Sequence, residues 1–143
     1  LYPSTPKAII IEAAHVIVEQ VTLDGVKAAQ IQYQTTNLKE RLAKYHGDHV
    51  PTLVSAWIDT WLDPAFADWD ITETLATINS PMLFIQGTAD EFGTLAQVTR
   101  TLEKVKGPKA QLSIPDDGHS PHKTSTTIVI DTVTDFLKSH ITS

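Results

Sequence analysis

The sequence predicts an α/β fold in which three parallel strands are flanked by helices. Compact apolar runs rich in β-branched residues predict the strands, over residues 7–12, 82–86 and 110–114. Amphipathic segments of helical period separate and follow these runs. Because parallel strands need crossover connections, the alternation of strand and helix favours a parallel sheet. A length of 143 residues suffices for one modest core, so we expect a single domain over residues 1–143.

The first strand and a long helical insertion fill the first half of the chain. Lys7–Glu12 is apolar on both faces, as in a buried parallel strand. A cap-like helical insertion is expected over about residues 22–69, where Asn37 and Glu40 fit a capping box. Pro51 suits the first turn of the next helix. Apolar residues then recur at helical spacing, and they form either core or one wall of an apolar cavity: Leu53, Val54, Trp57, Ile58 and Trp61.

The second half repeats a strand–helix unit. Asp70, with Glu73 three residues on, predicts a helix N-terminus, and Pro81 ends that helix before the second strand. Thr94 and Gln97 predict another capping box. The helix that follows should turn four residues inward: Leu95, Val98, Leu102 and Val105.

The final segment, Thr124–Ile141, allows two interpretations. Its many Thr, Ile and Val residues favour a strand by propensity. Its length exceeds that of a usual strand, and Val129, Val133 and Phe136 form a helical stripe. We therefore predict a helix.

Composition excludes several kinds of function. The net charge of −6, without a basic cluster, disfavours nucleic-acid binding, and no apolar run is long enough for a membrane-spanning helix. The absence of Cys excludes disulfides and thiolate metal sites. A soluble, cytoplasmic protein is the expectation. Because the sequence begins Leu1-Tyr-Pro, without an initiator Met or a signal-peptide layout, we expect a chain cut from something longer.

Asp90 and His119, whose side chains can exchange protons, lie on the turns that follow the second and third predicted strands. A parallel sheet brings such turns to one edge, so these side chains could meet. An aspartate there would accept the imidazole Nδ1–H and stabilise the imidazolium, while Nε2 takes a proton from a nucleophile. The alternative is that Asp90 only closes a turn and His119 is a loop residue. Spacing alone does not separate the two.

Other histidines offer further sites. His15 could face a pocket at the end of the first strand, or could be an ordinary hydrogen-bonded histidine. A metal site is an alternative use of His119 and His122, with a carboxylate from Asp90, Asp116 or Asp117. His46 and His49 form a second, weaker cluster. Pro121 separates His119 from His122 and makes a shared helical face improbable.

At these residues the sequence resembles the α/β-hydrolase family. The segment from Asp70 to Asp90 resembles the one that leads to the family's acid, and Asp117-Gly-His119 resembles its histidine loop. Lys7–Ala14 resembles the strand after the nucleophile helix. The resemblance covers nearly the whole chain but only the C-terminal half of the family's fold. It implies an esterase-like hydrolase with Asp90 as acid and His119 as base, a small-molecule substrate and no cofactor.

One part of the family's pattern is missing from the sequence. No Gly-x-Ser-x-Gly elbow occurs, and Gly118-His-Ser120 only approaches it. The chain alone is therefore expected to be inactive, with its first strand edge covered by a missing N-terminal half or a second copy. A non-catalytic binding module or subunit is the alternative. Four residues are candidates to contact a small ester or related carbonyl substrate: His15, Trp57, Trp61 and Phe92.

Overall fold

The structure is a computed structural model in which residues 6–141 are described. The chain divides into two compact units. Unit 1 combines the residues up to Ile17 with those from Asp70 onward, and unit 2 is Val18–Trp69. Each unit has its own packing.

Unit 1 contains a parallel sheet, as predicted. Its strands are β1 (Ile9–Glu12), β2 (Met82–Gly87) and β3 (Lys109–Ile114), in the order β1-β2-β3. All six residues of the central strand β2 are buried. The register places Ile85 beside Glu12 on one side and beside Leu112 on the other. Consequently the three strands point their carboxyl ends toward the same edge.

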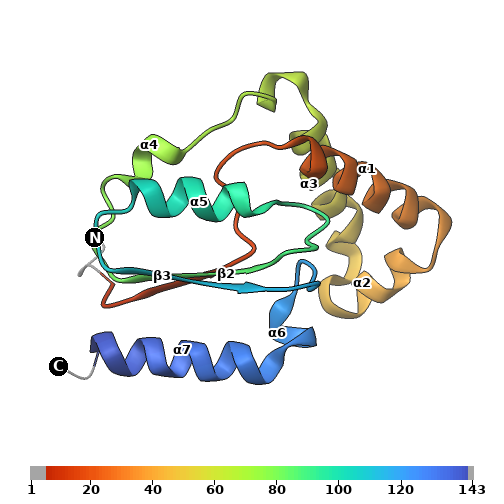
Figure 1. Cartoon of the computed structure of the whole chain (residues 1–143). Helices are drawn as coiled ribbons and strands as arrows, with labels where there is room; N and C mark the ends of the chain where they lie inside the picture. The colour runs from red at the N-terminus through yellow and green to blue at the C-terminus, as the bar shows by residue number, and fades with distance from the viewer. Residues whose placement is uncertain (1–5, 142–143) are drawn as a thin grey trace. The chain divides into compact units, whose positions relative to one another are not determined.

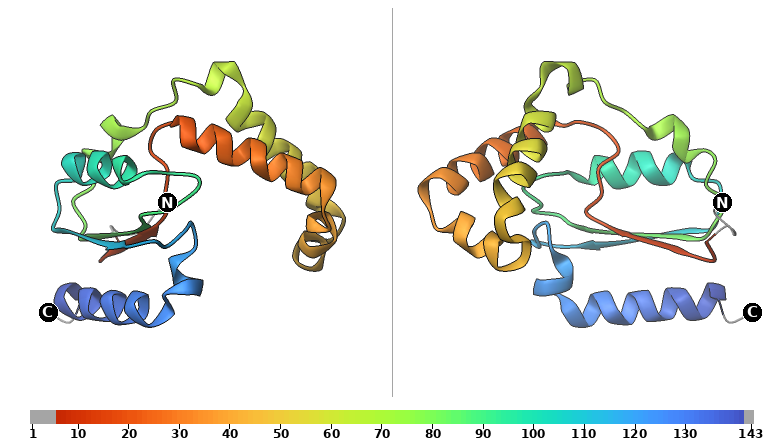
Figure 2. Two further views of the ribbon diagram at one scale, coloured as in Figure 1. Left: turned by 45° about the vertical axis from the view of Figure 1, so that its right-hand side comes forward. Right: turned by 180° about the vertical axis from the view of Figure 1, so that it is seen from behind.

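Helices cover both faces of this sheet (Figures 1 and 2). On one side lie α4 (Thr72–Leu75) and α5 (Leu95–Lys104), and on the other lies α7 (Thr126–Ile141), preceded by α6 (Pro121–Thr124). The prediction that the final segment is a helix is confirmed. Alternate β2 residues serve the two faces. One buried cluster consists of Leu83, Ile85, Ile114, Val129 and Phe136, and the other of Val16, Leu75, Met82 and Val105.

The strand β1 is less buried than predicted. Within the described residues β1 pairs with β2 alone. The Ile10 side chain is 38% exposed, so the prediction of burial on both faces is wrong at this position. Ile10 is exposed because β1 lies at the edge of the sheet, where no further strand packs beside it in the described residues.

Unit 2 is entirely helical. It contains α1 (Gln20–Thr35), α2 (Leu38–His46), η1 (Gly47–His49), α3 (Val50–Leu62) and η2 (Pro64–Phe66). Trp61 packs edge-on against Phe66 and Trp69, with ring centroids 5.4 and 5.9 Å apart. The predicted stripe on α3 is only partly core, because Ile58 is buried while Leu53 is 51% exposed and Trp57 38% exposed.

Two of the predicted capping boxes are corrected by the structure. The Asn37 side chain makes no capping hydrogen bond at the start of α2. Thr94 does cap α5, since its Oγ1 accepts the Ala96 N–H at 3.1 Å, but the Gln97 side chain turns elsewhere. Leu95 is 39% exposed rather than inward, because it lies in the first turn of α5.

Gln97 instead fixes the backbone where the chain leaves unit 1. Its Oε1 accepts the Val16 and Ile17 N–H groups at 2.8 and 3.3 Å, and its Nε2 donates to the Ile17 carbonyl at 3.1 Å. Gln97 has no exposed surface. A buried amide thus satisfies two backbone N–H groups and one carbonyl oxygen.

We expect Gln97→Leu to lower the free energy of unfolding by about 2–4 kcal/mol, because it leaves buried backbone groups without partners. Urea denaturation of the variant and the parent chain measures the change. Gln32→Leu, at an exposed position of α1, is the control and should change stability by less than about 0.5 kcal/mol. Equal effects of the two variants would contradict this role of Gln97.

Candidate active site

Asp90 and His119 meet at the carboxyl edge of the sheet. Asp90 stands on the turn after β2 and His119 on the loop after β3. The His119 Nδ1 lies 2.9 Å from Asp90 Oδ2 and 3.0 Å from Oδ1. The Asp90 side chain is fully buried and that of His119 is 36% exposed. The two residues form a hydrogen-bonded pair with its carboxylate inside and its imidazole at the surface.

Hydrogen bonds keep the buried Asp90 carboxylate ionised. Its Oδ1 accepts the Phe92 N–H at 2.8 Å, and its Oδ2 accepts the Gln86 Nε2–H at 2.6 Å. Burial raises the pKa of Asp90, but the hydrogen bonds from His119, Phe92 and Gln86 outweigh burial and hold the pKa below its ordinary value of 3.8. Asp90 is therefore a charged acceptor at neutral pH.

The same pairing makes His119 a stronger base. The hydrogen bond to Asp90 raises the pKa of His119 above 6.5, against a smaller lowering by burial. The charges of Asp90, Glu91 and Glu12 add to the increase in pKa. With the carboxylate as acceptor, Nδ1 carries the hydrogen, so Nε2 is the nitrogen that can take up a proton.

These two pKa shifts predict how stability depends on pH. His119, with its raised pKa, stabilises the fold fully below pH 6.5, and this contribution is lost as pH rises through its folded pKa. Asp90, with its lowered pKa, stabilises the fold above pH 3.8, and its contribution is lost as pH falls through its folded pKa. The pair therefore stabilises the fold most between these two values.

We expect the free energy of unfolding to fall between about pH 5.5 and about pH 9. Chemical denaturation at the two pH values measures the decrease. In Asp90→Asn the decrease should be smaller, because the charge that raises the pKa of His119 is gone. An unchanged pH dependence in this variant would contradict the coupling.

The histidine loop is held by several short contacts. The Asp117 Oδ1 accepts the Gly118 N–H at 3.0 Å and also the Thr124 hydroxyl hydrogen. Glu91 Oε2 accepts the His119 backbone N–H at 3.3 Å. Glu91 thus contacts the loop backbone rather than the imidazole, which leaves Asp90 as the ring's carboxylate partner.

Gly87 permits the loop to lie directly against the end of β2. A Cβ at this position would be 2.2 Å from the Asp117 carbonyl oxygen and 2.4 Å from that of Gly118. No larger residue fits without moving the backbone. The position of His119 therefore depends on a glycine in the neighbouring strand.

Two predicted substrate-binding residues lie beside the pair. The His15 Nε2 is 2.8 Å from the Phe92 carbonyl oxygen, and its ring centroid is 6.1 Å from that of His119. The Phe92 ring meets His119 edge-on at 4.9 Å. The other two candidates, Trp57 and Trp61, belong to unit 2, where Trp61 is part of the aromatic cluster.

Sequence reasoning missed two contributors to this edge of the sheet. Gln86 contacts Asp90, and the signal that could have found it is a polar residue at the end of an apolar buried strand. Glu12 forms a second carboxylate–imidazole pair, since its Oε1 accepts the His122 N–H and lies 2.9 Å from His122 Nδ1. Nothing in the sequence pattern connects Glu12 with His122.

The histidines do not gather into a metal site in the part of the chain that the structure describes. No group of three or more His, Asp, Glu or Cys residues there could hold a metal ion. His119 and His122 each have a separate carboxylate partner. Ser120, the nearest approach to a nucleophile elbow, occupies the position before α6.

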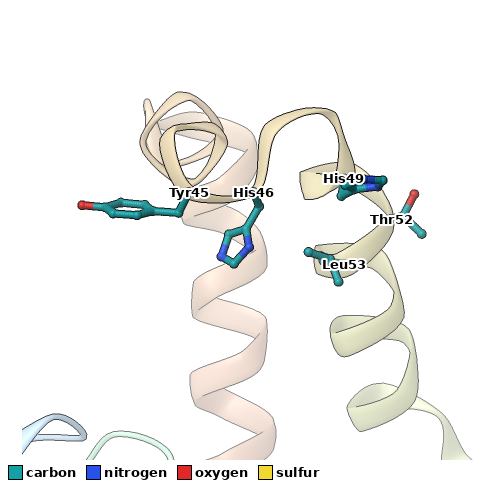
Figure 3. Close-up of a pocket in the computed structure, with 5 residues that line it drawn as sticks. All are labelled: Tyr45, His46, His49, Thr52 and Leu53. Atoms are coloured by element: carbon teal, nitrogen blue, oxygen red, sulfur yellow. The ribbon is translucent and has the colours of Figure 1, made fainter.

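Unit 2 contains a separate cavity of about 400 Å³ at the turn between α2 and α3. Its lining consists of Tyr45, His46, His49, Thr52 and Leu53 (Figure 3). The His46 and His49 rings do not point toward one another in this view. Tyr45 is 84% exposed, so the cavity is an open surface hollow. None of its lining residues belongs to the Asp90–His119 pair.

Comparison with known proteins identifies the fold. Epoxide hydrolase A of Mycobacterium tuberculosis (strain ATCC 25618 / H37Rv) is 34% identical over 83 residues, which are 57% of this chain and 26% of that protein. NosK from Streptomyces actuosus superimposes with a TM-score of 0.71 at 14% identity, over 94% of this chain and 59% of that one. A serine hydrolase involved in carbazole degradation gives a TM-score of 0.62 at 16% identity, over 91% and 53%. No family model matches the chain.

These similarities show that the chain has the α/β-hydrolase fold. It spans about half the length of the solved hydrolases that it matches and about a quarter of the curated relative. The resemblance read from the Asp90 and His119 segments is thereby confirmed at the level of the fold. None of the helices in residues 6–141 has both the length and the apolar character needed to cross a membrane.

Proposed function

We propose that this chain supplies the catalytic acid, Asp90, and the catalytic histidine, His119, of a serine-dependent α/β hydrolase. The supporting observation is the buried Asp90 carboxylate with both oxygens within 3.0 Å of His119 Nδ1. The fold of the similar structures and the position of both residues at the carboxyl edge of the sheet favour the same function. The substrate class is a small ester or related carbonyl compound.

In the proposed reaction a serine from outside these 143 residues attacks the substrate carbonyl. His119 Nε2 accepts the serine proton, and Asp90 stabilises the imidazolium. His119 then returns the proton to the leaving alcohol, which departs and leaves an acyl-enzyme. Water attacks this ester with His119 again acting as base. The bond to the serine oxygen then breaks, His119 returns the proton to that oxygen, and the acid product is released. The chain alone, without the serine, should be inactive.

His15 and Phe92 would contact the substrate in this proposal. Both rings lie next to the His119 ring, and Phe92 adds an apolar surface there. Trp57 and Trp61, in the helical insertion predicted as a cap, are also proposed to contact the substrate. A missing N-terminal segment or a second copy would cover the β1 edge, where the described residues provide one partner strand.

Epoxide hydrolysis is a second candidate function. The observation that favours it is the 34% identity to an epoxide hydrolase over 83 residues. His119 would then accept a proton from the attacking water rather than from a serine. Assays of a longer natural chain with an aryl ester and with an aryl epoxide distinguish the two candidates.

Fluorophosphonate labelling tests the proposal. The 143-residue chain should remain unlabelled, and a longer natural chain with a Gly-x-Ser-x-Gly elbow should be labelled at that serine. Intact-mass spectrometry measures the adduct, and peptide mapping locates it. Labelling of any serine within the 143 residues, Ser120 included, would contradict an external nucleophile.

A further inference from the structure

Gln86 is a polar residue in the most deeply buried strand of the sheet. Its side chain points to the same face of the sheet as those of Met82 and Phe84, which are both buried. Gln86 itself is only 1% exposed. Burying an amide costs free energy unless its polar atoms find partners, so its presence here needs a physical explanation.

The partners of Gln86 lie in the turn that carries the acid. One Nε2–H donates to Asp90 Oδ2 at 2.6 Å, and the other donates to the Gly93 carbonyl oxygen at 3.1 Å. Both partners are acceptors, which fixes the amide orientation with its nitrogen toward them. The buried Oε1 has no hydrogen-bond partner in the described part of the chain. The Gln86 amide thus donates hydrogen bonds to two acceptors in the turn, while its own Oε1 stays without a donor in the described residues.

This arrangement determines how the Asp90 carboxylate is rotated. The Phe92 N–H donates to Oδ1 and the Gln86 Nε2–H donates to Oδ2. Each carboxylate oxygen therefore has its own donor, and both oxygens also lie within hydrogen-bond distance of His119 Nδ1. Through Gly93 the same amide also holds the turn that carries Phe92, whose ring packs against His119. One side chain thereby restrains the acid and a neighbour of the base.

We propose that Gln86 is a positioning residue, which locks the Asp90 carboxylate in the rotation that pairs both of its oxygens with His119. Its catalytic consequence depends on the proposed function above, but its effect on the His119 imidazole does not. Without Gln86 the carboxylate turns about its remaining Phe92 contact, and the Asp90–His119 bond is made for only part of the time.

The test is the titration of the His119 ring by NMR in the 143-residue chain. Gln86→Met removes both donors at similar length, and Gln86→Asn retains an amide that is too short to reach Asp90. Gln97 is an equally buried glutamine whose amide oxygen accepts the Val16 and Ile17 backbone N–H groups, so Gln97→Met and Gln97→Asn are matched controls. The other charged or titratable groups that face His119 are Glu91, Glu12 and His15, which all variants retain.

In both Gln86 variants the proton affinity of His119 should fall by about three- to tenfold, and in folded Gln97 variants it should stay at the parent value. An unchanged titration in whichever Gln86 variant folds, or an equal change in the Gln97 variants, would overturn the proposal. Loss of folding in both Gln86 variants would also overturn the proposal, because it would show that Gln86 is needed for the fold rather than for the position of Asp90. Because the readout needs no nucleophile or substrate, it is independent of the fluorophosphonate result.

Discussion

His119→Ala, made in a longer chain that carries the nucleophile, is expected to lower kcat/KM for an ester substrate by about 10³–10⁴-fold. The imidazole is the group that moves the proton in both halves of the proposed reaction, and its partner Asp90 cannot replace it from a buried position. Steady-state kinetics of the variant and parent measure the loss.

His122→Ala is the matched control for that experiment. His122 is also a histidine hydrogen-bonded to a carboxylate at the same edge of the sheet, but its partner is Glu12 and its side chain is 52% exposed. Its loss should change kcat/KM by less than about threefold, because exposed ion pairs contribute little. Equal losses in the two variants would rule out His119 as the specific base.

Gly87→Ala is expected to lower the free energy of unfolding by about 3 kcal/mol. The new Cβ would lie 2.2 Å from the Asp117 carbonyl oxygen, and both the β2 backbone and the histidine loop would have to move apart. Since a displacement of about 1 Å can cost about 10²-fold in rate, the activity of a longer chain should fall as well. Thermal denaturation and kcat measure the two effects.

Gly47→Ala separates this clash from the general effect of replacing a glycine. Gly47 has a φ of 54°, and a Cβ there would meet nothing within 4 Å. With a ψ of −137° its backbone lies in a region that favours glycine, so replacement should cost only backbone strain, about 1–3 kcal/mol. If Gly87→Ala cost no more than Gly47→Ala, the close approach of the histidine loop to β2 would be wrong.

The sheet and its helices could be predicted because the strongest sequence signals decide them. The β2 run is apolar from Met82 to Ile85 and ends at Gly87, so its burial and its turn can be predicted from the local sequence. The stripe from Val129 to Phe136 outweighed the strand propensity of its Thr and Ile residues, and α7 is a helix. Asp90 and His119 could be paired because parallel strands bring their following turns together.

The side chains that support the pair could not be predicted, since their partners are distant in sequence. Gln97 fits the capping-box spacing after Thr94, but the buried backbone of Val16 and Ile17 offers it stronger hydrogen bonds. Glu12 meets His122 only because β1 and α6 reach the same edge of the sheet. A local sequence pattern shows which nearby partners a side chain could have. Which partner it takes also depends on residues that only the fold brings close.

Asp90 and His119 are expected to act as one unit, and the titration of the His119 ring measures their coupling. NMR of the parent chain should give a His119 pKa above 6.5, because the Asp90 carboxylate accepts the Nδ1–H. In Asp90→Asn its proton affinity should fall by about tenfold, whereas Asp116→Asn, on the same loop as His119, should leave it unchanged. A His119 titration that is the same in the parent and in Asp90→Asn would contradict the account.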